Sequence, residues 1–242
     1  MTGMRNFTFF IVLLILGCQD APEKRTVDNE APEDTIMVVP TDTASLPKPA
    51  EAPLVLNRLD YDSTAWTDIA LLDSSILIDM RYATESNFVE EKMYECGRCF
   101  LRKEVAVQLI RAHKALQGRG YGLKMFDCYR PRPIQWKLWE KVPDRRYVSD
   151  PRKGSMHNRG AAVDLTIVDA EGNELDMGTP YDFFGPQAHP SYTALPDTVL
   201  HHRQLLSETM IHYGFRPTNT EWWHFSWNGQ NYPLSDMLWE CD

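Results

Sequence analysis

The sequence predicts an α+β fold, in which a small antiparallel sheet is flanked by helices. Segments with helical and strand periodicity are mixed along the chain, without the regular alternation that builds a parallel sheet. Hydrophobic residues make up 43% of the 242 residues, which is enough for the core of one ordinary domain. No internal repeat and no second linker follow residue 54, so we expect one domain over residues 54–242.

Three segments have the periodicity of helices. In residues 101–116, apolar side chains recur three or four positions apart. Residues 134–140 follow two prolines and have a helical pattern as well. A third helix is expected to run to Tyr213, with Asp197 or Thr198 as its N-cap, because short polar side chains satisfy the first free backbone N–H groups.

Three other segments are expected to form strands. Residues 123–128 and 161–168 alternate between two faces, and residues 222–227 are rich in aromatic β-formers. The alternation in the second strand places Asp164 on the polar face. If the second and third strands are neighbours, Asp164 and His224 can converge on one point.

The first 18 residues have the features of an export signal. A single arginine precedes an apolar run of about ten residues, which is shorter than the roughly 20 that a membrane-spanning helix needs. The run ends at Ile15-Leu-Gly-Cys18, which resembles the bacterial lipobox, in which the cysteine is lipidated. An ordinary secretory signal or an uncleaved anchor is the alternative. Both predict that the protein leaves the cytoplasm, and the lipobox predicts a lipid-anchored protein of the cell envelope, facing the periplasm or the exterior.

Residues 19–53 are predicted to be a disordered tether. Six of the 16 prolines and no aromatic residue lie there, together with eight acidic and three basic residues. Such a segment cannot bury enough apolar surface to offset its ordering entropy. The net charge of the whole chain is −9, which argues against nucleic acid as a partner.

Four cysteines follow Cys18, and in an oxidising compartment they allow one or two disulfides with three possible pairings. Cys96 and Cys99 also have the spacing of half a structural zinc site. A second pair at this spacing is absent from the sequence, so we favour structural thiols or disulfides for Cys96, Cys99, Cys128 and Cys241.

Two of the seven histidines have chemically informative neighbours. His157 precedes Asp164 by seven residues, with Gly160 between them, and His224 closes the run Glu221-Trp-Trp-His. A catalytic zinc ion needs three N or O ligands and a nearby carboxylate that is not a ligand. A buried polar network is the alternative that spacing alone leaves open. The other histidines have the contexts of solvated or packed residues: His113, His189, His201, His202 and His212.

Four stretches together resemble the D-alanyl-D-alanine dipeptidase family, which includes the vancomycin-resistance dipeptidases and is related to zinc D,D-carboxypeptidases. The first two are Ser155-x-His157-x-x-Gly160-x-Ala-x-Asp164 and Glu221-Trp-Trp-His224. The others are Asp79-Met-Arg-Tyr82-Ala-Thr and Tyr129-Arg130-Pro131, which narrow the resemblance to dipeptidases. It runs from about residue 55 to the end of the chain.

The resemblance implies a zinc enzyme that hydrolyses D-alanyl-D-alanine to two D-alanines. It implies one Zn²⁺ per chain, held by His157, Asp164 and His224, with Glu221 as the general base and acid. Arg130 would stabilise the oxyanion.

The resemblance also implies the substrate contacts: Tyr82 and Asp182 would hold the substrate ammonium, and Ser155 would lie near the bound dipeptide. The alternatives are a zinc D,D-carboxypeptidase acting on peptidoglycan stem peptides and a non-catalytic wall-binding lipoprotein. No protein partner is predicted.

Overall fold

The computed structural model describes residues 59–241 of the chain. The predicted signal segment, Cys18 and the predicted tether lie outside these residues. Within the described part, no helix is both long enough and apolar enough to cross a membrane.

A five-stranded sheet forms the centre of the fold, with the strand order β2-β4-β5-β7-β6. Its neighbours pair antiparallel, except that the short edge strand β2 runs parallel to β4. The α+β prediction is therefore confirmed, and the parallel edge strand is an addition to it. The strands are β2 (Leu77–Ile78), β4 (Gly122–Asp127), β5 (Ala162–Val168), β6 (Phe215–Pro217) and β7 (His224–Trp227).

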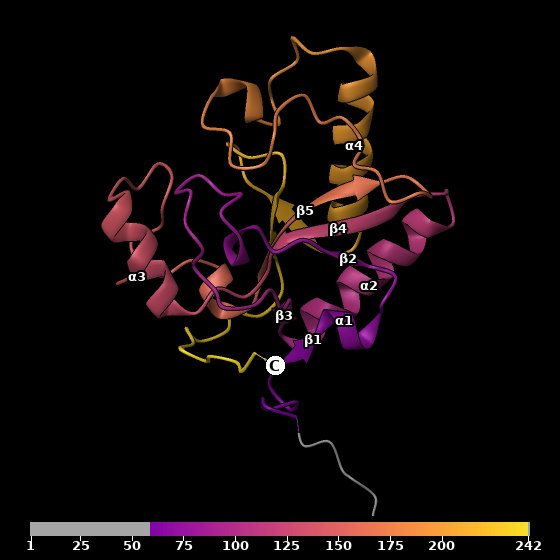
Figure 1. The fold of residues 1–242 in the computed structure, drawn as a ribbon. Coiled ribbons are helices and arrows are strands. Elements are labelled where there is room, and N and C mark those ends of the chain that lie inside the picture. The colour runs from indigo at the N-terminus through magenta and orange to yellow at the C-terminus, as the bar shows by residue number, and fades with distance from the viewer. Residues whose placement is uncertain (1–58, 242) are drawn as a thin grey trace, which may run out of the picture. The chain divides into compact units, whose positions relative to one another are not determined.

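The longer helices flank this sheet. In Figure 1, α2 and α4 lie against β4 and β5, and α3 lies apart from them on the other side of the molecule. A separate two-stranded sheet joins β1 (Thr67–Asp68) to β3 (Phe100–Leu101). The helices are α1 (Ile69–Leu72), α2 (Lys103–Gln117), α3 (Arg132–Lys141) and α4 (Asp197–His212), and the short 3-10 turns are η1 (Arg81–Ala83), η2 (His157–Arg159) and η3 (Pro186–Ala188).

Strand β5 is buried along all seven of its residues. Val163, Leu165 and Ile167 belong to the main apolar cluster together with the inner faces of α2 and α4. Asp164 lies on the opposite face, as the alternation predicts, but loops cover that face too. The polar face of the central strand is thus the floor of a buried site.

All three predicted helix starts differ from the structure, and α3, expected from residue 134, begins at Arg132. The first long helix begins at Lys103 instead of residue 101, because Phe100 and Leu101 pair with β1. In α4, Asp197 is already the first helical residue, and Pro196 occupies the cap position without a side-chain hydrogen bond. The proline ring has no hydrogen-bond acceptor, so the expected polar N-cap is absent from α4.

The predicted strand 222–227 begins only at His224. Trp222 and Trp223 precede it in a turn and are buried in the main core. The Trp222 indole N–H donates to Thr179 Oγ1 at 2.8 Å, and Trp223 O accepts from Leu165 N at 3.1 Å. The aromatic residues therefore contribute packing, and not a longer strand.

All four cysteines of the domain form disulfides. Cys96 bonds Cys241, and Cys99 bonds Cys128. This excludes the half-zinc-site alternative for the first pair of cysteines and resolves the pairing that the sequence left open. The second bridge is completely buried, beside the end of β4.

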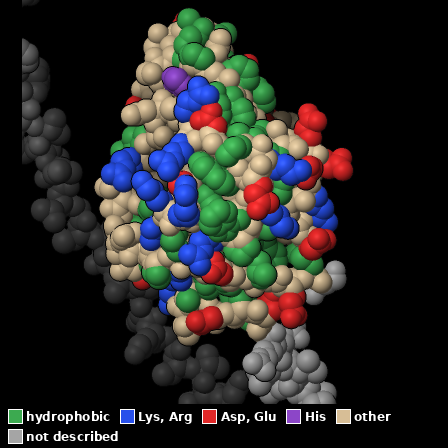
Figure 2. All heavy atoms as spheres, turned by 90° about the vertical axis from the view of Figure 1, so that its left-hand side faces the viewer, with side chains coloured by type: hydrophobic (Ala, Val, Ile, Leu, Met, Phe, Trp, Pro, Cys, Tyr) green, Lys and Arg blue, Asp and Glu red, His purple; other side chains and the backbone are tan. Residues whose placement is uncertain are grey.

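Lys and Arg side chains gather on the face that α3 covers, with acidic side chains beside them (Figure 2). In the loop after α3, Arg145 and Arg152 both bond Asp150, at 2.9 and 2.7 Å. These bonds, led by that of Arg152, keep the pKa of Asp150 well below its usual range. The ion pairs fix a loop whose Tyr147 and Val148 contribute to the candidate site.

Candidate active site

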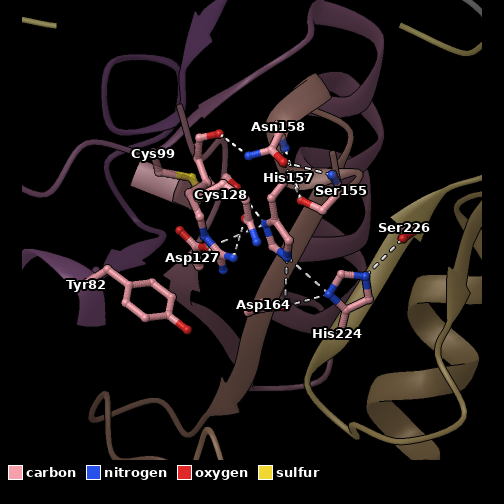
Figure 3. Close-up of polar contacts among 12 residues, drawn as sticks. Tyr82, Cys99, Asp127, Cys128, Ser155, His157, Asn158, Asp164, His224 and Ser226 are labelled. Carbon is pink, nitrogen blue, oxygen red and sulfur yellow. Dashed lines mark hydrogen bonds and ion pairs between the residues drawn. A yellow bond between two sulfur atoms is a disulfide. The ribbon is translucent and has the colours of Figure 1, made fainter. Parts of the chain in front are cut away.

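One cavity of about 90 Å³ brings together all the site residues that the sequence predicted within the described chain. They come from η1, η2, β5, β7 and four separate loops. Figure 3 shows several of them pointing toward a common centre. The predicted residues that line the cavity are Tyr82, Arg130, Ser155, His157, Asp164, Asp182, Glu221 and His224.

Three of these side chains direct one N or O atom each at the same point. His157 Nε2 lies 3.1 Å from His224 Nδ1 and 3.3 Å from Asp164 Oδ1. His224 Nδ1 lies 2.9 Å from the same carboxylate oxygen. A tetrahedral ion with bonds of about 2.0–2.1 Å would separate its ligand atoms by about 3.3 Å. The spacing of the three atoms fits a zinc ion.

Hydrogen bonds behind the three side chains leave the inward atoms free. His157 Nδ1 lies 2.7 Å from Cys128 O, which can only accept, so its Nε2 carries a lone pair. His224 Nε2 lies 3.0 Å from Ser226 Oγ, which can accept its proton and leave Nδ1 bare. Two bare nitrogens 3.1 Å apart repel each other unless a cation lies between them. With these tautomers the donor set fits a metal ion.

The local backbone explains why His157 and Asp164 meet. Gly160 ends η2 with φ +67°, and a Cβ there would come within 2.3 Å of Trp66. Only glycine adopts this conformation without penalty, so the chain turns directly from the histidine into β5. Asp164 then pairs in register with His224 on β7. The expected convergence of Asp164 and His224 on neighbouring strands is confirmed.

Arg130 is buried and held by residues on both sides. Its Nε and Nη2 donate to Asp127 Oδ2 at 3.0 and 2.5 Å, and its Nη1 donates to Gln135 Oε1 at 3.0 Å. The guanidinium lies 4.7 Å from the centre of the Tyr82 ring. Burial lowers the pKa of Arg130, but Asp127 together with the nearby tyrosines outweighs burial and holds the pKa well above its usual value. The site therefore contains one fixed positive charge.

Three carboxyl groups share the cavity with this cation. Burial, and then the nearby Asp164, raise the pKa of Asp182 well above its ordinary value. Burial likewise raises the pKa of Glu221, although His224 opposes this. Asp182 also has a positive φ of 56°, which is strained for a residue other than glycine. Such a concentration of negative charge favours a cationic ligand.

Residues outside the predicted set hold the side chains that line the cavity in place. The Tyr181 hydroxyl donates to Asp164 Oδ2 at 3.0 Å, which leaves Oδ1 for the central point. The sequence predicted no role for Asp127, Tyr181 or Ser226, which hydrogen-bond Arg130, Asp164 and His224. Asp127 and Tyr181 lie close in sequence to the predicted residues Arg130 and Asp182, and this proximity could have drawn attention to them.

An aromatic rim borders the same cavity. The Phe184 ring lies 4.3 Å from that of Tyr147 and 5.0 Å from that of Phe88, measured between centroids. Each of these residues comes from a different loop, and all three line the cavity. No sequence pattern connects them, so sequence analysis missed the rim.

Ser155 has a backbone role that the sequence did not reveal. Its N–H and hydroxyl both donate to Asn158 Oδ1, at 2.8 and 3.1 Å. Asn158 Nδ2 in turn donates to Arg130 O at 2.7 Å. The serine is therefore linked to the segment that carries Arg130 as well as to the cavity.

A wider hollow of about 460 Å³ lies beside His113 but lacks the bonding of a catalytic pair. Leu123 N–H donates to His113 Nδ1, so Nε2 carries the ring proton and donates to Ser75 Oγ at 2.9 Å. The histidine cannot then accept a proton from that serine. This agrees with the expectation that His113 is a packed residue.

Comparison with known proteins agrees with the geometry. The Peptidase_M15 family, described as D-ala-D-ala dipeptidase, matches residues 62–239. A D-alanyl-D-alanine dipeptidase of Escherichia coli (strain K12) is 35% identical over 181 residues, which is 74% of this chain and 94% of that protein. One from Enterococcus faecium is 29% identical over 178 residues, covering 65% of this chain and 88% of that protein. The solved structure "VanYB in complex with D-Alanine-D-Alanine" has 16% identity and a TM-score of 0.38, covering 54% of this chain and 73% of that one.

The fold and the site define a metallopeptidase. The chain belongs to the D-alanyl-D-alanine dipeptidase family, and the resemblance stated from the sequence motifs is confirmed at this level.

Proposed function

We propose that this protein hydrolyses D-alanyl-D-alanine to two D-alanines with the help of one zinc ion. The observation that carries the proposal is the convergence of the eight predicted side chains on one small cavity. His157, Asp164 and His224 would hold the ion through the three atoms that lie 2.9–3.3 Å apart. A zinc ion in such a site supplies a water of lowered pKa and polarises the scissile carbonyl.

Glu221 is the proposed proton carrier. It lines the cavity beside the three ligands, and its raised pKa suits a group that must both take and release a proton near neutral pH. Its carboxylate takes a proton from the attacking water and passes it to the leaving amine. It is not one of the three residues whose ligand atoms converge.

Arg130 is proposed to stabilise the negative charge that develops on the carbonyl oxygen. Asp127 and Gln135 hold the guanidinium in place before substrate arrives, so no reorganisation is needed during the reaction. A buried guanidinium stays charged at every relevant pH.

Asp182 and Tyr82 are proposed to bind the free ammonium of the dipeptide. The Tyr82 hydroxyl donates to Asp182 Oδ2 at 3.3 Å, which orients the carboxylate within the cavity. A bound ammonium would offset the repulsion from Asp164 and Glu221 that raises the pKa of Asp182. Ser155, which also lines the cavity, is proposed to contact the bound dipeptide.

The small cavity and its aromatic rim favour a dipeptide over a longer peptide. A volume of about 90 Å³ is well below the roughly 300–1,000 Å³ of pockets for drug-sized ligands. The rim formed by Phe88, Tyr147 and Phe184 would obstruct an extended stem peptide. These features favour the dipeptidase over the D,D-carboxypeptidase alternative.

Acetylating the amine of D-Ala-D-Ala is expected to lower kcat/KM by about tenfold to a few hundredfold. A charge-assisted hydrogen bond contributes roughly 1.5–3 kcal/mol, and each 1.36 kcal/mol corresponds to a factor of ten. In Asp182→Asn the free dipeptide should be cleaved more slowly, while the acetylated one should change little. Initial rates for both substrates with both proteins give the four values needed.

Asp236→Asn serves as the control, because Asp236 is an exposed partner of Arg132 and does not line the cavity. It should preserve the difference between the two substrates. Faster cleavage by the wild type of the acetylated dipeptide, or of a stem pentapeptide, would favour the carboxypeptidase.

We also propose that Cys18 carries a lipid anchor and that the domain works in the cell envelope. The support is the short apolar run that ends in Leu-Gly-Cys18. Cys18→Ser is expected to move the protein from the membrane fraction to the soluble fraction and to abolish incorporation of radiolabelled fatty acid. An unlabelled, soluble wild type would contradict the anchor.

A further inference from the structure

The Cys99–Cys128 disulfide lies directly after the end of strand β4. β4 pairs regularly with β5 until a register shift between Met125 and Asp127, after which the strand ends. Cys128 follows directly, and its bridge reaches Cys99, with 5.2 Å between the two Cα atoms. Tyr129 N–H adds a backbone bond to Phe100 O at 2.9 Å. The disulfide thus holds the chain in place just after the hydrogen bonds between β4 and β5 end.

The segment that this bridge fixes holds two parts of the site. Cys128 O accepts from His157 Nδ1 at 2.7 Å, and Arg130 N–H donates to His157 O at 3.1 Å. Figure 3 shows the disulfide sulfur beside Cys128, with His157 next to it. Two residues after Cys128, the chain carries the Arg130 guanidinium. A shift of Cys128 would therefore move both the carbonyl that accepts from His157 and the backbone of Arg130.

The other disulfide provides an internal contrast. Cys96–Cys241 spans 145 residues, against 29 for Cys99–Cys128, and Cys241 is exposed. The Cys96 carbonyl accepts from Trp239, which does not line the cavity, whereas the Cys128 carbonyl accepts from His157, which does. A longer closed loop restricts the unfolded chain more, so stabilisation alone would make Cys96–Cys241 the more important bridge. If Cys99–Cys128 positions the site, its loss should lower zinc affinity and kcat more than the loss of Cys96–Cys241 does.

We propose that the Cys99–Cys128 disulfide is a positioning element of the site, which fixes the Cys128 carbonyl so that His157 presents Nε2 to the metal and Arg130 is held over the substrate. The proposal rests on the proposed function for its catalytic part. Its metal-binding part stands on the geometry of His157 alone. Outer hydrogen-bond partners of metal ligands typically contribute 10- to 100-fold in affinity or activity.

The test compares three double variants of the full chain. Cys99→Ala/Cys128→Ala removes the bridge, Cys99→Ala/Cys128→Val removes it while filling more of the space, and Cys96→Ala/Cys241→Ala is the control. For each protein, the zinc dissociation constant is measured by competition with a metallochromic chelator. Then kcat and KM for D-Ala-D-Ala are measured with zinc in excess, and Tm is measured by calorimetry.

Both variants without the Cys99–Cys128 bridge are expected to bind zinc about 10- to 100-fold more weakly and to lose a similar factor in kcat, with KM nearly unchanged. The control should keep both values within about threefold, although its Tm falls at least as far. Weaker zinc binding without any dipeptidase activity in the wild type would support the positioning role and refute the proposed function.

Equal zinc constants and equal kcat in the two kinds of variant would overturn the proposal. Failure of both Cys99/Cys128 variants to fold, while the control folds, would also overturn it, because the bridge would then be a stability element.

Discussion

Replacing Glu221 with alanine is expected to lower kcat for D-Ala-D-Ala by at least about 10²–10⁴-fold while zinc remains bound. General acid–base groups typically contribute this much, and the proposed role uses Glu221 in both proton transfers. The carboxylate lines the cavity but is not one of the three groups whose ligand atoms converge. Steady-state rates and zinc content of the same preparation test both parts of the expectation.

Glu221→Gln separates proton transfer from size, because it preserves the shape of the side chain. It should be nearly as slow as the alanine variant. Turnover close to that of the wild type in either variant would require a different base.

Asp164→Ala is expected to lose zinc, with an affinity reduced by more than the roughly 100-fold that outer-shell changes cause. The carboxylate is buried at the floor of the cavity and stands 2.9 Å from His224 Nδ1 and 3.3 Å from His157 Nε2. Removing it leaves two ligands, fewer than catalytic zinc sites use. His157→Ala and His224→Ala should behave in the same way when bound zinc is measured after dialysis.

Tyr181→Phe is the matched control for Asp164→Ala. It removes only the hydroxyl that donates to Asp164 Oδ2 and leaves all three ligands in place. Zinc affinity should fall by about 10- to 100-fold, and stoichiometric zinc should bind when it is supplied. Full zinc retention in all three ligand variants would show that these residues do not bind the metal.

The part of the site that sequence predicted best depends on short-range geometry. The turn at Gly160 and the period of two along β5 fix the relation of His157 to Asp164 within eight residues. The meeting with His224 needed one assumption, that two strands are neighbours, and the register confirms it.

The parts that could not be predicted depend on contacts between distant segments. Four cysteines allow three pairings, and only the fold brings Cys99 beside the end of β4. The last strand was predicted to begin at Trp222, but it begins at His224. Aromatic residues are common both in strands and in cores, and Trp222 and Trp223 pack in the core. Asp127 and Tyr181 act through other side chains, which a linear motif does not reveal.

The decisive experiment is hydrolysis of D-Ala-D-Ala by the purified protein, measured as release of D-alanine. A stem pentapeptide is measured in parallel, and each reaction is repeated after zinc is removed with a chelator and after it is restored. A zinc dipeptidase should cleave the dipeptide only while zinc is bound, should recover when zinc is restored, and should cleave the pentapeptide little or not at all. Cleavage that persists in the metal-free protein, or a clear preference for the pentapeptide, would contradict the proposed function.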